Sequence, residues 1–120
     1  MSLKADLIAK ILHVRKKMSV LMEFSMFPLE GEGSKSAYVA RIIEMIHTSG
    51  YPYKLTPMST IVETESLHEA LKLVEYAYAQ IDECERVYAC LKFDIRQNRD
   101  NGMEQKIASV EHHLGHTLHT

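Results

Sequence analysis

The chain has 120 residues, of which 46% are hydrophobic and 25% charged, and its formal net charge is −2 with histidine neutral. This length favours one domain with its own core, and the composition is that of an ordinary globular protein. The charge provides no overall basic field for nucleic acid, and no run of about 18 apolar residues is present to span a membrane.

Residues 1–17 are predicted to form an N-terminal helical extension. Apolar residues recur there at helical spacing, at Leu3, Leu7, Ile8, Ile11 and Leu12. Lysines lie elsewhere around the helix, at Lys4, Lys10, Lys16 and Lys17. Such a helix can pack on the domain or on a neighbouring subunit. A membrane-surface helix is the weaker alternative, because Asp6 interrupts the basic face and no bulky aromatic residue anchors the apolar one.

The most strand-like run of the chain is Ser19–Pro28, in which Pro28 ends the predicted strand. Alternate residues of a strand point to opposite faces of a sheet. One predicted face is wholly apolar and consists of Val20, Met22, Phe24 and Met26. The other face is mixed and consists of Leu21, Glu23, Ser25 and Phe27. Because the mixed face suits neither a sealed core nor bulk water, it predicts an interface or a pocket.

A helix is predicted over 36–49, after an acidic, glycine-containing loop at 30–33 whose carboxylates argue against a phosphate site. Ser34 or Ser36 can cap this helix, and Gly50 stands where a helix C-terminal glycine belongs. Its predicted buried stripe is Val39, Ile42, Ile43 and Ile46. Two short strands at 53–56 and 60–63 follow, separated by a break at Pro57; one long kinked strand is the alternative.

The second half of the chain predicts a helix at 67–84, a strand at 86–96 and a helix at 104–114. Ser66 and Glu69 form a capping box at the start of the first of these helices. The predicted inner stripe of that helix is Leu67, Ala70, Leu71, Val74, Ala77, Tyr78 and Ile81. The strand has an apolar face of Val87, Ala89, Leu91, Phe93 and Ile95. Its opposite face carries Tyr88, Cys90, Lys92, Asp94 and Arg96. The last helix is expected to turn Ile107, Val110 and Leu114 inward.

After the extension, the order of elements is βαββαβ with a further C-terminal helix. This order is that of the α+β, ferredoxin-like sandwich, in which two helices cover one face of the sheet. The apolar faces of the first and last strands are expected under those helices, and the other face of the sheet is expected to be open.

The open face is predicted to be an interaction surface, because Leu21, Phe27 and Tyr88 would form an exposed apolar patch on it. The simplest explanation of such a patch is that copies of the chain pair with one another through their sheet faces. The charge pairs Glu23–Lys92 and Asp94–Arg96 are expected to neutralise one another there.

Neither catalysis nor metal binding is predicted. The serines and threonines have no histidine in a motif context, so the protein is not expected to be an enzyme. The tail contains His112, His113, His116 and His119, but Gly115 breaks the helix register and the run lies at a terminus, so we expect no metal site and no cofactor. Cys84 and Cys90 are not a CxxC pair, and without a secretion signal they indicate thiols in a reducing cytoplasm.

Three stretches together resemble the thiamine-binding protein family, a group of small ferredoxin-like proteins. They are SVLMEFSMFPL at 19–29, YVARIIEMIHTSGYPYKLTPMSTIVE at 38–63, and VYACLKFDIR at 87–96 with the later Gly102, Met103 and Lys106. The likeness covers about residues 18–114, and the division it implies is an extension at 1–17 and a thiamine-binding-type domain at 18–120.

The resemblance implies a cytoplasmic, non-catalytic homodimer or homotetramer that pairs through sheet faces and binds thiamine or its hydroxymethylpyrimidine part. The positions that match by motif are Glu23, Ser25, Phe27, Thr56, Thr60, Glu63, Lys92, Asp94 and Arg96. Carboxylates or an aromatic face suit the cation of thiamine, and hydroxyl groups suit the edge of its pyrimidine. The alternative is a structural or regulatory self-assembly module with no small ligand, in which Glu23 only pairs with Lys92, the threonines are only strand formers and Phe27 only fills an interface.

Overall fold

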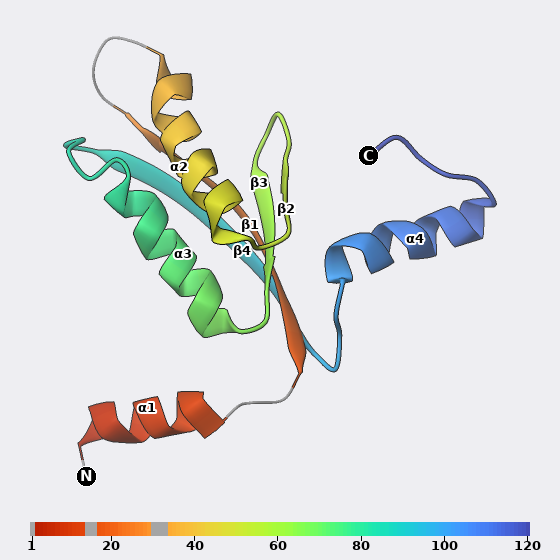
Figure 1. Cartoon of the computed structure of the whole chain (residues 1–120), viewed down its shortest axis with the longest axis horizontal. Helices are drawn as coiled ribbons and strands as arrows, with labels where there is room; N and C mark the ends of the chain where they lie inside the picture. Colours follow the sequence, from red (N-terminus) through yellow and green to blue (C-terminus); the bar gives the residue numbers. More distant parts are fainter. Residues whose placement is uncertain (1, 14–16, 30–33) are drawn as a thin grey trace.

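The computed structural model describes residues 2–13, 17–29 and 34–120. Four helices and four strands lie in this described part (Figure 1). Their bounds are α1 Leu3–His13, β1 Met18–Pro28, α2 Lys35–Ser49, β2 Tyr53–Leu55, β3 Thr60–Thr64, α3 Leu67–Ala79, β4 Val87–Gln97 and α4 Gly102–Leu114. The predicted loop at 30–33 and the side chains of Lys10, Ile11, Leu12 and Lys16 lie outside the described residues.

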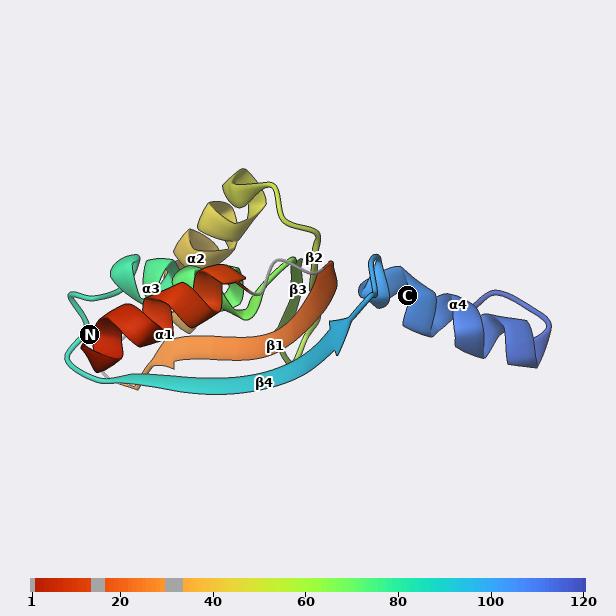
Figure 2. The same cartoon turned by 90° about the horizontal axis from the view of Figure 1, so that it is seen from below.

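The four strands form one antiparallel sheet in the order β2-β3-β1-β4. Strand β1 pairs with β4 along its whole length, from Met18 opposite Gln97 to Pro28 opposite Val87. Helices α2 and α3 lie on one face of this sheet (Figure 2). The arrangement confirms the predicted ferredoxin-like α+β fold, and the run at 53–64 forms two strands rather than one.

Local sequence signals explain where the two covering helices begin and end. The Ser34 side chain accepts a hydrogen bond from Ser36 N at 3.2 Å and caps α2. Gly50 ends α2 with φ 84°, a left-handed conformation that glycine adopts without cost. Ser66 accepts from Glu69 N at 3.1 Å, which confirms Ser66 as the predicted cap of α3, and Ser66 Oγ donates to the Glu69 carboxylate at 3.1 Å.

The core lies between β1 and the two helices. The predicted apolar face of β1 is confirmed, since its four residues are at most 5% exposed. They pack with Ile42 and Ile46 of α2 and with Ala70, Leu73 and Ala77 of α3. Burial of large apolar side chains such as Met22 and Phe24 stabilises the fold by about 1.5–3 kcal/mol each.

The prediction that β4 has a fully covered apolar face is wrong. Leu91 and Ile95 point to the helix side, opposite Phe24 and Val20 of β1, but they are 39% and 49% exposed. The reason is that β4 is an edge strand, whereas α3 packs over β1 and β3 and α2 packs over β1. Phe93, in the middle of β4, is packed against the core.

Helices α3 and α4 also differ from prediction. Helix α3 ends at Ala79, and tight turns carry the chain on to Ile81 and Cys84, which remain buried. Leu73 belongs to its inner stripe, whereas three predicted members, Leu67, Leu71 and Tyr78, are exposed. In α4, Val110 and Leu114 are half exposed because the helix projects away from the sheet (Figures 1 and 2).

Candidate ligand groove

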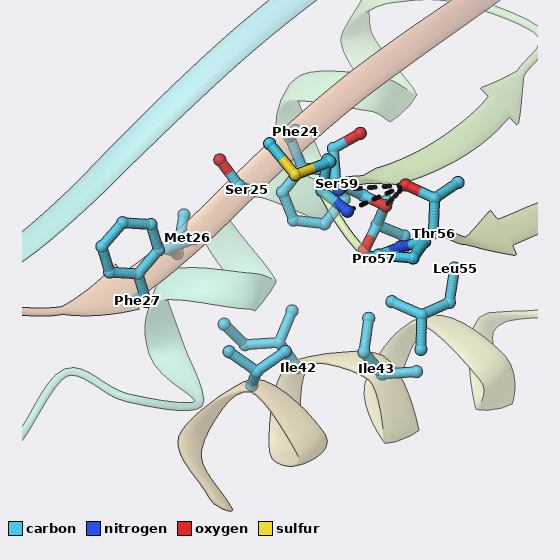
Figure 3. A pocket seen from close by; sticks show the side chains of 13 residues that line it. Phe24, Ser25, Met26, Phe27, Ile42, Ile43, Leu55, Thr56, Pro57 and Ser59 are labelled. Carbon is cyan, nitrogen blue, oxygen red and sulfur yellow. Dashed lines mark hydrogen bonds between the residues drawn. The ribbon is translucent and has the colours of Figure 1, made fainter. Parts of the chain in front are cut away.

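A groove opens where β1 continues beyond the end of β3. The pairing between these strands stops at Phe24 opposite Thr60, so residues 25–28 of β1 have no β3 partner. Helix α2 and the turn at 56–59 lie beside this free part of β1, around a cavity of about 270 Å³ (Figure 3). The fold therefore creates a hollow at the end of its central strand.

The lining of the cavity combines apolar walls with a group of hydroxyls. The apolar part includes Phe27 from β1, Ile43 from α2 and Leu55 from β2. The lining residues that carry a hydroxyl are Ser25, Thr56, Ser59 and Thr60, of which Thr60 is only 5% exposed. An apolar site with a few polar groups that fix orientation is the usual form of a small-molecule pocket.

A second, more open hollow of about 670 Å³ adjoins the first and shares Phe27, Val39, Ile43 and Leu55 with it. It adds the only charged groups of the described lining, Lys35 and Glu44. The two hollows together are called the groove below. The groove extends along α2 from Lys35 to the turn at 56–59, which contains Met58.

The turn at 56–59 is held rigid by one threonine. Thr56 Oγ1 donates to the Ser59 carbonyl at 2.8 Å and accepts from Ser59 N at 3.1 Å and from Met58 N at 3.3 Å. The backbone N–H of Thr56 also donates to the Ser59 carbonyl, at 2.9 Å. The Thr56 hydroxyl thus shapes the rim of the groove, and Pro57 fixes one backbone angle of the same turn.

Phe27 is the aromatic surface of the groove. Its ring lies 5.7 Å from the ring of Tyr88 on β4, measured between centroids. Lys35 Nζ stands 5.1 Å from the centroid of the Phe27 ring, so a cation already occupies a place near this aromatic face. The pair shows that the ring is accessible to a positively charged group.

The structure brings together four of the nine predicted ligand residues, namely Ser25, Phe27, Thr56 and Thr60, in the groove. Three others line a shallow hollow of about 220 Å³ on the open face of the sheet, namely Glu23, Lys92 and Asp94. Arg96 is exposed on β4 opposite Ser19, and Glu63 lies elsewhere, beside α4.

The charged groups of the open-face hollow are engaged with one another. Lys92 Nζ lies 3.5 Å from Glu23 Oε1. Asp94 pairs with Arg99 at 3.1 Å and with Lys106, so the predicted Asp94–Arg96 pair is wrong. Hydrogen bonds from Lys106 and Arg99 hold the pKa of Asp94 below its ordinary value of 3.8.

Glu63 is buried in a network that we call the α4 anchor, formed by Ser19, Glu63, Arg99 and Gly102. The Glu63 carboxylate, in a residue only 8% exposed, accepts from Ser19 Oγ at 2.7 Å, Gly102 N at 2.8 Å and Met103 N at 3.1 Å. Burial raises the pKa of Glu63, but the hydrogen bonds from Ser19, Met103 and Gly102 outweigh burial and hold it below its ordinary value of 4.5. These contacts cap the first turn of α4, where a carboxylate is favourable.

Arg99 and Gly102 complete this anchor. Arg99 is 6% exposed and donates to the carboxylate of Asp94 and to the carbonyl of Ser19, at 3.1 and 3.2 Å. A Cβ at position 102 would lie 2.6 Å from Arg99 Nε and 2.9 Å from Ser19 Oγ, so only glycine fits without displacement. The geometry indicates that Glu63 has a structural role, which is to anchor α4.

Sequence reasoning missed the groove residues Ile43, Leu55, Ser59, Lys35 and Glu44. Helical spacing places Ile43 in the predicted buried stripe. Leu55, Ser59 and Glu44 lie within the stretch at 38–63 that carries the resemblance but are not among its matched site positions, and no motif marks Lys35. The sequence signal that could have located these residues is Pro57. It marks a turn between two short strands, and because β1 is longer than β3, the part of β1 beyond this turn has no β3 partner.

Two other kinds of site receive no support from the described part of the chain. None of its helices is both long enough and apolar enough to cross a membrane. Among the same residues, no three His, Cys, Asp or Glu side chains are grouped so that they could hold a metal ion.

Comparison with known proteins gives a consistent family match. Residues 22–111 match the family model of the thiamine-binding protein. UPF0045 protein Mb1933 of Mycobacterium bovis is 35% identical over 99 residues, which are 81% of this chain and 96% of that protein. The solved structure of protein MJ1052 from Methanocaldococcus jannaschii is 30% identical, with a TM-score of 0.67 over 77% of this chain and 95% of that one. A domain of unknown function from Bacillus cereus is 25% identical, with a TM-score of 0.67 over 76% of this chain and 88% of that one.

Proposed function

Because the chain belongs to the family of thiamine-binding proteins, we propose that its groove binds a small heteroaromatic ligand, thiamine or its hydroxymethylpyrimidine part, without catalysis. The observation that carries this proposal is the lining of the groove. Apolar walls stand beside four hydroxyl-bearing residues, in a hollow of the volume that small ligands occupy.

The two parts of thiamine match the two parts of the groove. The flat aminopyrimidine has donors and acceptors on its edge, which hydroxyls such as those of Ser25 and Thr60 can address. The thiazolium carries a fixed positive charge, which the Phe27 face and the Glu44 carboxylate in the more open hollow can attract. Lys35 would have to leave its position over Phe27 for the cation to stack there.

The open-face hollow is the poorer candidate for the same ligand. Its carboxylates, Glu23 and Asp94, already pair with Lys92, Arg99 and Lys106. A ligand cation would have to compete with three built-in cations there. The groove presents one lysine and one carboxylate, so it leaves more room for an added charge.

The make-up of the groove supports binding rather than reaction. Its described lining contains no histidine or cysteine, and Glu44 is the single carboxylate. General acid–base or nucleophilic catalysis requires an activated pair of groups within hydrogen-bond reach. The family is also named for binding and not for an activity.

Titration calorimetry with thiamine and with hydroxymethylpyrimidine tests the proposal. We expect the wild-type chain to bind at least one of them, and Phe27→Ala to weaken that binding about tenfold or more, since an aromatic contact contributes about 1.4 kcal/mol in such sites. Glu23→Ala, on the open face, is the control and should retain wild-type affinity. The absence of binding heat at millimolar ligand, or equal losses in both variants, would contradict the groove as the site.

A second candidate function is self-assembly through the open sheet face, with no small ligand. Tyr88 on this face is half exposed, Phe27 lies opposite it, and Leu21 and Ile61 are partly exposed farther along the same face. We propose that two copies pair through these faces into a homodimer, or a homotetramer of two such pairs. Light scattering should then show a multimer that Tyr88→Asp dissociates, whereas a wild-type monomer would defeat this candidate.

We propose that the protein acts in the cytoplasm. Cys84 and Cys90 form no disulfide in the structure, and reduced thiols are typical of that compartment.

A further inference from the structure

One side of α3 carries an exposed apolar row. Helical geometry places Glu69 and Leu71 about 100° to either side of the buried Ala70. The Glu69 carboxylate accepts a hydrogen bond from Tyr51, just beyond α2, at 2.9 Å, so Leu71 faces away from α2. Leu67 and Tyr78 are spaced four and seven residues from Leu71 and share its side. All three are exposed.

Strand β4 adds to this row, because Leu91 and Ile95 are exposed on the same helix side of the sheet. We call Leu67, Leu71, Tyr78, Leu91 and Ile95 the lateral strip. Single exposed leucines are ordinary on a protein surface, whereas several large apolar side chains on one side mark an interaction site.

Helix α1 leaves a second apolar surface uncovered near the lateral strip. It lies on the side of α3 that faces away from α2 (Figures 1 and 2). Leu3, Leu7 and Ile8 are exposed, with Leu3 at 74%. A helix of 11 residues is marginal in water without tertiary contacts, so α1 requires a surface to pack on.

The connection to β1 is held at the end of the sheet. Asn98 N donates to the Lys17 carbonyl at 2.7 Å, and Lys17 Nζ lies 2.6 Å from Asp100. These contacts attach the chain after α1 to the segment between β4 and α4.

Charge and length match between the two surfaces. Glu75 follows Leu71 by one helical turn and Asp82 lies in the turns just after α3; both are exposed and make no ion pair within the described part of the chain. Lys4 is exposed beside Leu3 and Leu7 on α1. Helix α1 is about 16 Å long, which is also the distance from Leu67 to Tyr78 along α3.

We propose that the lateral strip and α1 form an interface with a second copy of this chain. A two-fold axis would place α1 of each copy on the lateral strip of the other, with Lys4 facing Glu75 and Asp82. Such an interface requires both complementary surfaces on the same side of one molecule, as they are here. Helix α1 precedes residues 22–111, the part that matches the family, so this contact belongs to the extension of this chain.

Light scattering on the full chain tests the proposal with two separate variants. Leu7→Asp alters α1, and Leu71→Asp alters the lateral strip at a residue that is already half exposed. Each is expected to halve the wild-type mass, and the double variant should have no further effect. Tyr76→Asp is the matched control on the other side of α3, and it should keep the wild-type mass.

A charge exchange provides an independent measurement. Lys4→Glu should weaken association about tenfold, and adding Glu75→Lys with Asp82→Lys should restore it. A monomeric wild type, or a Leu7→Asp variant of unchanged mass, would overturn the proposal. Unchanged mass with an equal loss of thermal stability in Leu7→Asp and Leu71→Asp would show that α1 packs on its own chain, which also overturns it.

Discussion

The two ends of β1 contain polar groups in opposite situations. At its start, Ser19 donates to Glu63, and Glu63 also accepts from the first two N–H groups of α4. Near its end, Ser25 and Thr60 line a groove between apolar walls. At the first end the polar groups bind one another, beside a hollow of about 260 Å³ that Met18 and Glu63 line; at the other end the polar groups line the groove.

This difference separates structural from functional polar residues. A buried carboxylate that accepts from three donors of its own chain has most of its hydrogen-bonding capacity occupied, so it holds elements in place. Hydroxyl-bearing residues that line an apolar hollow can contact a ligand that enters it. By this criterion Glu63 belongs to the fold, and Ser25 with Thr60 belongs to the proposed site.

The largest effect on stability is expected from Glu63→Ala. The substitution leaves the N–H groups of Gly102 and Met103 and the hydroxyl of Ser19 without their acceptor, which should lower the free energy of unfolding by about 3 kcal/mol. Urea unfolding measures this loss. Glu65→Ala, at the exposed neighbour, should cost less than about 0.5 kcal/mol. If Glu63→Ala instead abolished ligand binding at unchanged stability, the structural and ligand-binding roles of the two ends of β1 would have to be exchanged.

A smaller effect is expected from acid. The folded state holds the pKa of Glu63 below 4.5, so it favours the carboxylate, and the resulting stability is present above pH 4.5 and lost as the pH falls through the lower folded value. Glu63→Gln should therefore be less stable than wild type at neutral pH, and the difference should narrow below pH 4.5. Urea midpoints across this range provide the measurement. A difference that stays constant with pH would contradict the anchor.

The smallest effect is expected from Glu23→Gln on the open face. Glu23 and Lys92 are 3.5 Å apart and both are solvent-exposed, with side-chain exposures of 44% and 78%. Exposed pairs contribute about 0–1 kcal/mol, so the unfolding free energy should change by less than about 0.5 kcal/mol. Differential scanning calorimetry checks this. A loss comparable to that of Glu63→Ala would show that the open-face charges are structural.

Much of the fold could be predicted from the sequence because its signals are local. The alternation along Ser19–Pro28 identified the buried face of β1, and Ser66 with Glu69 located the start of α3. Which strands the helices cover, in contrast, depends on contacts between segments that are far apart in the sequence. The pattern of Leu91 and Ile95 is that of a buried strand, but their exposure depends on the edge position of β4 and on the strands that α3 covers.

The same distinction applies to the site. Ser25, Phe27, Thr56 and Thr60 were predicted from motif positions, and the structure gathers them in one groove. The position of Glu63 could not be predicted, because its partner Gly102 lies 39 residues later in the chain. Arg99 was missed for a similar reason, since its burial depends on contacts with Ser19, 80 residues away.

The location of bound ligand tests the groove most directly. Backbone amide chemical shifts, recorded while thiamine is added to the full chain, report which residues sense it. The groove predicts that Ser25, Phe27, Ser59 and Thr60 shift first and with a common dissociation constant, while Glu23 and Lys92 stay in place. Saturable shifts centred on Glu23, Lys92 and Asp94 would contradict it and place the ligand on the open face.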